Sequence, residues 1–180
     1  MIGIPMGLAY ANVTEWLVHK HVLHGRGRSR KSFWSFHWMD HHRLVRLNGH
    51  RDPDYERSVL GWHGQGKEAA MLLAGCAAHA PLLPIAPFFT ATVWYSAANY
   101  YIKHKRSHLD PEWAREHLPW HYDHHMAPDQ DANWCVTRPW FDHVMGTRVP
   151  YLGTDRERED RARAEKRRAR KAAQAEREAA

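Results

Sequence analysis

Cysteine is scarce in this chain, and its scarcity excludes two kinds of site. Only Cys76 and Cys135 are present, and they lie far apart in different sequence contexts. Two such cysteines form neither a disulfide framework nor a CxxC zinc motif. A reducing, cytosolic environment is therefore the simpler expectation for the polar part of the protein.

Charge is missing from a long internal segment. Residues 69 to 102 contain no Lys, Arg, Asp or Glu, and Pro81, Pro84 and Pro87 interrupt them near the middle. Because one straight helix of this length would overshoot a bilayer core of roughly 30 Å, a hairpin of residues 68–83 and 88–103 is predicted. Residues 2–24 form a second apolar segment, which has neither the basic start nor the cleavage site of a secretory signal.

These segments predict an all-α integral membrane bundle of about three membrane helices, one of them a hairpin. The alternative is a buried helical pair in a soluble protein. Basic residues follow both segments, at 26–31 and 103–106, and the positive-inside rule places them on the cytosolic side. The net charge of +6 is concentrated there and in the tail, so no nucleic-acid partner is expected.

The chain divides by composition into residues 1–153 and a tail of residues 154–180. The tail is rich in Arg, Glu and Ala, which is typical of a solvated helix or a disordered segment. We expect the tail to lie on the cytosolic side with the polar part of the main domain.

Histidine is abundant, with sixteen residues, and ten of them fall into four spaced groups. Neutral imidazole is the commonest protein ligand for iron, zinc and copper. If all groups share the cytosolic side, ten imidazoles could supply two metal ions with four or five nitrogens each. The alternative is that these histidines bind no metal and lie at the protein surface and at the membrane interface. The predicted ligands are His19, His24, His37, His41, His42, His104, His108, His121, His124 and His125.

The spacing of the first histidine group leaves open which of its residues bind metal. His19 and His24 lie about 140° apart on an ideal α-helix, whereas His21 and His24 lie about 60° apart. The motif spacing nevertheless favours His19. The remaining histidines, His50, His63, His79, His117 and His143, match no motif and are assigned structural roles.

The order HKHVLH, HWMDHH, HKRSH, HYDHH and WFDHVMGT resembles the fatty acid hydroxylase / sterol desaturase superfamily of integral membrane oxygenases. The resemblance covers about residues 10–150. It implies a helical membrane scaffold with a cytosolic, histidine-rich helical cap that holds a dimetal site. The second group, HxxxHH, is one residue longer than the family's HxxHH, so which of His37, His41 and His42 hold metal stays open.

The function that the resemblance implies is a membrane-bound di-iron oxygenase that hydroxylates a lipid-like substrate such as a fatty acyl chain. Iron is the expected metal, with zinc as the alternative. The chain lacks a CxxC cluster and a glycine-rich nucleotide loop, so electrons would come from a separate ferredoxin, cytochrome or flavin reductase. The alternatives are a carotenoid hydroxylase, a sterol-type desaturase and, from another class, a non-redox metal-binding membrane protein.

Metal-bound histidine normally donates its second ring N–H to an acceptor. Four carboxylates near the motifs are candidates for this role: Glu15, Asp40, Asp123 and Asp142.

Overall fold

The structure is a computed structural model that describes residues 2 to 179. All regular secondary structure in this range is helical, which confirms the predicted all-α class. The chain divides into two compact units, Met1–Val149 and Pro150–Ala180, and each is described by itself.

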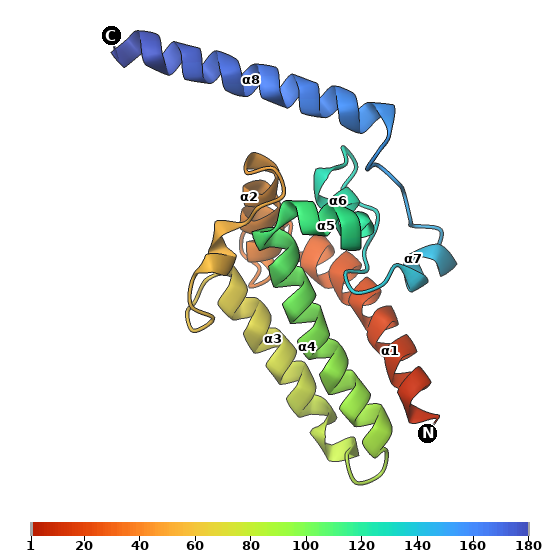
Figure 1. Cartoon of the computed structure of the whole chain (residues 1–180). Helices are drawn as coiled ribbons and strands as arrows, with labels where there is room; N and C mark the ends of the chain where they lie inside the picture. Colours follow the sequence, from red (N-terminus) through yellow and green to blue (C-terminus); the bar gives the residue numbers. More distant parts are fainter. Residues whose placement is uncertain (1, 180) are drawn as a thin grey trace. The chain divides into compact units, whose positions relative to one another are not determined.

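Three long helical segments form the scaffold of the first unit (Figure 1). They are α1 (Gly3–Leu17), which continues as the π-helix η1 (Val18–Arg26), α3 (Gly64–His79) and α4 (Pro87–Leu109). Helix α4 packs against both α1 and α3, and the short helices α2, α5 and α6 gather near the end of α4 that carries Leu109 (Figure 1). The shorter elements of this unit are η2 (Phe36–His41), α2 (His42–Leu47), η3 (Pro53–Glu56), η4 (Ala80–Leu82), α5 (Pro111–His117), α6 (Pro119–Met126) and α7 (Trp140–Val144).

Two glycines explain the close contact between α1 and α4. A Cβ atom on Gly7 would lie 2.8 Å from the Thr92 Cβ atom, and one on Gly3 would lie 2.8 Å from the Phe89 nitrogen. Small residues four apart allow two helices to approach closely, so this pair sets the separation of α1 from α4.

The predicted hairpin is present as α3 and α4. Pro81 lies in the first turn of η4 and Pro87 opens α4, where a missing N–H removes no helical hydrogen bond. Among residues 2 to 179, no helix combines the length and the apolar character needed to cross a bilayer. The prediction of about three membrane-spanning helices is therefore not supported by the structure.

Helices α5 and α6 turn the chain back toward the scaffold. The Asp110 side chain accepts a hydrogen bond from the Trp113 amide, and Pro111 occupies the first turn of α5. Pro119 starts α6 in the same way. Residues 118–125 of this turn and helix are largely buried, which places the last histidine group inside the unit.

The second unit consists mainly of α8 (Asp155–Ala179). The Thr154 hydroxyl accepts a hydrogen bond from the Glu157 amide at its start. Ion pairs four residues apart, such as Arg156 with Asp160 and Arg163 with Glu159, support the exposed helix.

Candidate metal centre

The first histidine pair lies on a π-helix. Helix η1 has i→i+5 hydrogen bonding, which places residues five apart nearly above one another. His19 and His24 are both buried, with ring centroids 5.1 Å apart, whereas His21 is exposed. The separation of about 140° expected for an α-helix therefore does not apply, and the structure favours His19 over His21.

The second group also lies on a π-helix, which accounts for its extra residue. Helix η2 ends at His41, and the Nε2 atoms of His37 and His42 lie 3.2 Å apart across five residues. His41 points elsewhere, and its ring centroid lies 4.5 Å from that of His108. The HxxxHH spacing thus divides its imidazoles between two sets.

The third and fourth groups lie on ordinary α-helices. On α4, His104 and His108 are four residues apart and their Nε2 atoms are separated by 3.2 Å. On α6, the His121 Nε2 atom lies 3.0 Å from that of His108, and the His124 Nε2 atom lies 3.3 Å from that of His42. Helix α6 therefore contributes to both sets.

Ligand atoms within 4.8 Å of one another define three buried groups. We call His19, His24, His37, His42 and His124 site A, and His41, His104, His108 and His125 site B. The third group, His50, His108 and His121, shares His108 with site B. All ten predicted ligands lie in these three groups. The ring centroids of His42 in site A and His125 in site B are 4.4 Å apart, so the two sites adjoin one another.

The spacing of the nitrogens fits metal coordination. Metal–imidazole bonds of roughly 2.0–2.1 Å place neighbouring ligand nitrogens about 2.9–3.3 Å apart. The Nε2 atoms of His19 and His37 lie 2.9 Å apart, and those of His24 and His42 lie 3.0 Å apart. The donor sets therefore have the separations that a shared cation requires.

Hydrogen bonds at Nδ1 direct the lone pairs of site A inward. His19 Nδ1 donates to the Trp134 carbonyl at 2.6 Å, and His124 Nδ1 donates to the Ala132 carbonyl at 2.7 Å. A carbonyl only accepts, so each Nδ1 carries the proton and each Nε2 presents a lone pair. The Nε2 lone pairs of these two ligands are therefore available to a metal ion.

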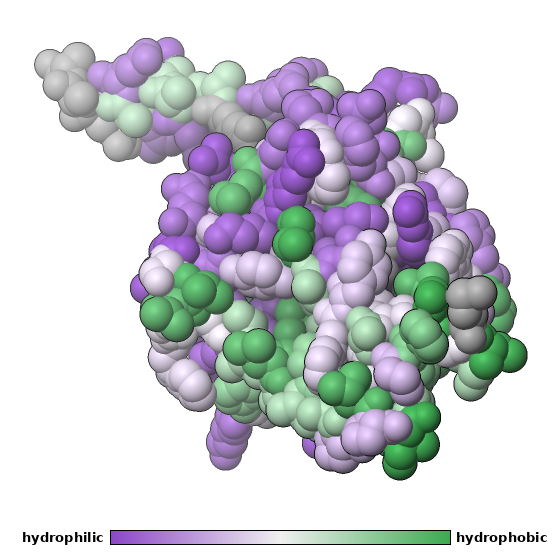
Figure 2. All heavy atoms as spheres, turned by 60° about the horizontal axis from the view of Figure 1, so that its bottom comes forward, coloured by the Kyte–Doolittle hydropathy of each residue, from purple (hydrophilic) through white to green (hydrophobic). Residues whose placement is uncertain are grey.

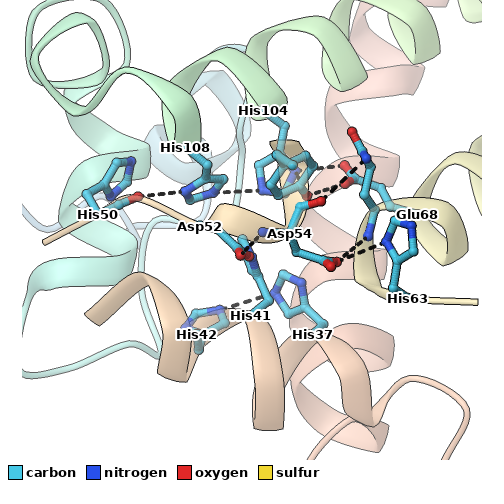
Figure 3. Close-up of polar contacts among 12 residues, drawn as sticks. His37, His41, His42, His50, Asp52, Asp54, His63, Glu68, His104 and His108 are labelled. Carbon is cyan, nitrogen blue, oxygen red and sulfur yellow. Dashed lines mark hydrogen bonds and ion pairs between the residues drawn. The ribbon is translucent and has the colours of Figure 1, made fainter. Parts of the chain in front are cut away.

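Carboxylates orient the ligands of site B (Figure 3). His41 Nδ1 donates to Asp52 Oδ2 at 2.6 Å, and His104 Nδ1 donates to Glu68 Oε1 at 2.7 Å. The Tyr55 hydroxyl donates to the other Glu68 oxygen. Neither carboxylate was predicted from the sequence. Two signals were available, because Glu68 directly precedes the uncharged segment and Asp52 follows the second histidine group.

Two of the four predicted carboxylates contact backbone instead of histidine. Glu15 accepts hydrogen bonds from the amides of Val136 and Thr137, and Asp142 accepts them from the amides of Trp134 and Cys135. Both acids thus fix the segment that supplies the Trp134 carbonyl to His19, and they lie one step further from the candidate ligands than predicted.

The other two predicted carboxylates also take different positions. Asp40 is exposed at the surface, and buried Asp123 forms an ion pair with Arg148 at 2.7 Å. His50, which was assigned a structural role, is fully buried beside His108. The other histidines assigned structural roles, His63, His79, His117 and His143, lie outside the three groups.

Burial lowers the pKa of seven of the clustered imidazoles and so keeps them neutral. It lowers the pKa of His124 and of His50 to about 3, because the charged form loses its hydration. For the same reason the pKa values of five others lie well below that of free imidazole: His37, His42, His108, His121 and His125. Neutral imidazole is the form that binds metal.

Two cavities of different character reach the centre. An apolar cavity of about 250 Å³ lies between α1, α3 and α4, and His19 is among the residues that line it. A cavity of about 320 Å³ with many charged residues is lined by His41 and His104 of site B. Both are lined by Leu23, Met71 and Tyr100, so these three side chains lie where the cavities approach one another.

No family model, curated protein or solved structure matches this chain. The inference that its buried histidines could hold metal ions therefore rests on their geometry alone.

Proposed function

We propose that this protein is a dimetal oxygenase that hydroxylates a lipid-like substrate, such as a fatty acyl chain, with O2 and external electrons. The observation that carries the proposal is the pair of adjoining imidazole sets at ligand spacing, one of which borders an apolar cavity. Iron is the proposed metal in both sites.

The apolar cavity suits an alkyl chain. Its walls include Leu72, Val93 and Ala97, and His19 of site A also lines it. An alkyl chain in this cavity would exclude water and hold one carbon beside the metal ligands. The cavity would thus position an unactivated C–H bond beside the metal site, as hydroxylation requires.

Two bound irons would supply O2 binding and oxidation of the C–H bond. The protein orients four of the ligands, because the Nδ1 protons of His19 and His124 are held by carbonyls and those of His41 and His104 by carboxylates. The Asp52 and Glu68 carboxylates also offset positive charge at site B.

Electrons are proposed to come from a separate acidic donor protein, such as a ferredoxin. The basic block after η1 offers a docking surface, since Arg26, Arg28 and Arg30 are exposed. This block follows directly on the helix that carries His19 and His24, so a donor bound there would lie close to site A in sequence and space.

The apolar ends of α1 and of the hairpin are proposed to enter a lipid bilayer. Ile2 is 76% exposed and Ile85 is 82% exposed, and Met6 and Phe88 are also mostly exposed. Figure 2 shows hydrophobic residues gathered on the face that carries these ends. Exposed apolar surface of this kind is typical of a membrane contact, and the apolar cavity between the same helices would receive its substrate from the lipid.

The test is oxygen incorporation. The full chain is loaded anaerobically with Fe(II), mixed with lipid vesicles and a reduced ferredoxin system, and exposed to ¹⁸O2. A lipid product heavier by one labelled oxygen is expected. A product lighter by two hydrogens would instead identify a desaturase.

A variant with both His104→Ala and His108→Ala serves as the negative control, because it removes two site B ligands. Full iron loading of the wild type without any oxidised lipid would contradict the proposal and favour a non-redox metal-binding protein.

A further inference from the structure

We propose that the imidazole of His50 is an additional metal ligand and that it belongs to the ion of site B. The inference rests on the metal pair of the proposed function and extends its ligand set beyond the histidine motifs. Figure 3 shows His50 beside His108, on the chain that follows α2.

The backbone at His50 is unusual. Its φ of 83° lies in the left-handed region, which residues other than glycine rarely adopt. The His50 amide donates to the Val45 carbonyl at 2.8 Å, so this conformation closes the end of α2. Such a conformation costs conformational free energy, and residues that adopt it cluster at functional sites.

The ring of His50 is buried with both nitrogens lacking a hydrogen-bond partner among the described residues. A buried polar group without a partner loses its hydration and gains no hydrogen bond in return. His63 provides the contrast, since its Nδ1 contacts Asp54 Oδ2 at 3.2 Å and its Nε2 contacts the Ser58 carbonyl at 2.8 Å. A metal ion would satisfy a nitrogen of His50 that the protein leaves without a partner.

The neighbours of His50 are ligands already assigned. One of its ring nitrogens lies within 4.8 Å of donor nitrogens of both His108 and His121. The ring centroids of His50 and His108 are 4.8 Å apart, and those of His50 and His125 are 5.5 Å apart. His50 therefore faces the interior of the histidine cluster.

A third, independent ion is not required. His108 Nδ1 donates to the His50 carbonyl at 3.0 Å, so only its Nε2 has a free lone pair. That atom lies 3.2 Å from His104 Nε2 and 3.0 Å from His121 Nε2. The single Nε2 lone pair of His108 can bind only one ion. Because His108 belongs both to site B and to the group with His50 and His121, these two histidines are assigned to the ion of site B.

This assignment makes site B the richer site, with six candidate imidazoles. His50 is the one candidate among the eleven that lies outside a helix, because residues 48 to 50 form a turn. We infer that His50 completes the coordination of site B and that five helical ligands hold the ion without it.

The experiment compares His50→Asn with a matched control, His63→Asn. Asparagine tolerates a positive φ, so the substitution removes the imidazole with little change in backbone preference. Each full-length protein is titrated with Co(II), and both the affinity and the intensity of the d–d absorption are recorded. In His50→Asn, we expect one of two Co(II) ions to bind at least about tenfold more weakly, with stronger d–d absorption as its coordination number falls.

Wild-type affinities and spectra in both variants would overturn the proposal. If His50→Asn does not fold, ¹H–¹¹³Cd correlation spectra of the cadmium-loaded wild type replace it. The His50 ring protons should then couple to the same cadmium as those of His108, and coupling of the other ligands without His50 would reject the inference. Failure of the wild type to bind any metal would instead reject the proposed function.

Discussion

Site A and site B are built from similar numbers of imidazoles, but different groups orient them. At site A, the carbonyls of Ala132 and Trp134 accept the Nδ1 protons. At site B, the carboxylates of Asp52 and Glu68 take this role for two ligands. A carboxylate raises the basicity of the imidazole that it contacts more than a neutral carbonyl does.

The difference indicates an electrostatic asymmetry between the two ions. The ion of site B would lie among imidazoles backed by negative charge, all of it buried. The ion of site A would depend on five imidazoles, two of them oriented by neutral carbonyls, and the carboxylate that approaches this site, Asp131, is half exposed and lies 3.6 Å from His24 Nδ1. Site B should therefore be the site that is sensitive to loss of charge, and site A the site that is sensitive to the position of residues 132–134.

The largest expected effect separates the two sites by removing ligand pairs. His37→Ala with His42→Ala should abolish the ion of site A, and His104→Ala with His108→Ala should abolish that of site B. Each double variant is expected to keep the other ion, as measured by elemental analysis of the purified protein. The pair His63→Ala with His117→Ala is the matched control and should retain both ions. Retention of both ions by either site variant would show that the division is wrong.

A smaller effect is expected when charge is removed without loss of a ligand. Asp52→Asn and Glu68→Gln should each weaken the ion of site B by about 10–100-fold, because the outer hydrogen bond loses its negative partner. Competition with a chelator of known affinity measures the change. Asp54→Asn, an acid of the same cavity that contacts His63, is the control and should leave both affinities unchanged. Equal weakening of both sites would remove the asymmetry.

The spacing of the histidine motifs was sufficient to predict ten of the histidines that lie in the three buried groups, although it missed His50. It was not sufficient to explain why His19 and His24 converge. That convergence depends on i→i+5 hydrogen bonding in η1, which is set by packing against the rest of the unit and has no local signature in the sequence.

The acceptors were harder to predict than the ligands. Asp40 and Asp123 lie inside histidine motifs, yet Asp40 is exposed and Asp123 pairs with Arg148. The acids that contact His41 and His104 come from residues 11 and 36 positions away in the chain. The contact between Glu68 and His104 depends on how α3 packs on α4, so proximity in sequence was a poor guide.

The membrane prediction shows a different limit. The segment from residue 69 to 102 lacks charge, but small and polar residues such as Gly75, Ser96 and Asn99 dilute its apolar character. Absence of charge is a weaker property than the sustained hydropathy that a membrane-crossing helix needs. What the structure retains of the prediction is the hairpin itself.

The smallest effect on metal binding should come from Asp142, which acts on site A through the backbone. Its carboxylate accepts hydrogen bonds from the amides of Trp134 and Cys135 and from the Thr147 hydroxyl, at 2.7–2.9 Å. In Asp142→Asn, one oxygen becomes an NH2 group that faces a donor. We expect the free energy of unfolding to fall by about 1–3 kcal/mol, as measured by urea denaturation.

The same variant should weaken the ion of site A less than tenfold and leave that of site B unchanged, because the Trp134 carbonyl shifts while Asp52 and Glu68 stay in place. Glu159→Gln is the control. Glu159 is an exposed acid paired with Arg163 on α8, so its loss should change stability by less than about 1 kcal/mol. Weakening of site B in Asp142→Asn, with site A intact, would mean that residues 134–135 do not serve the site that their hydrogen bond to His19 indicates.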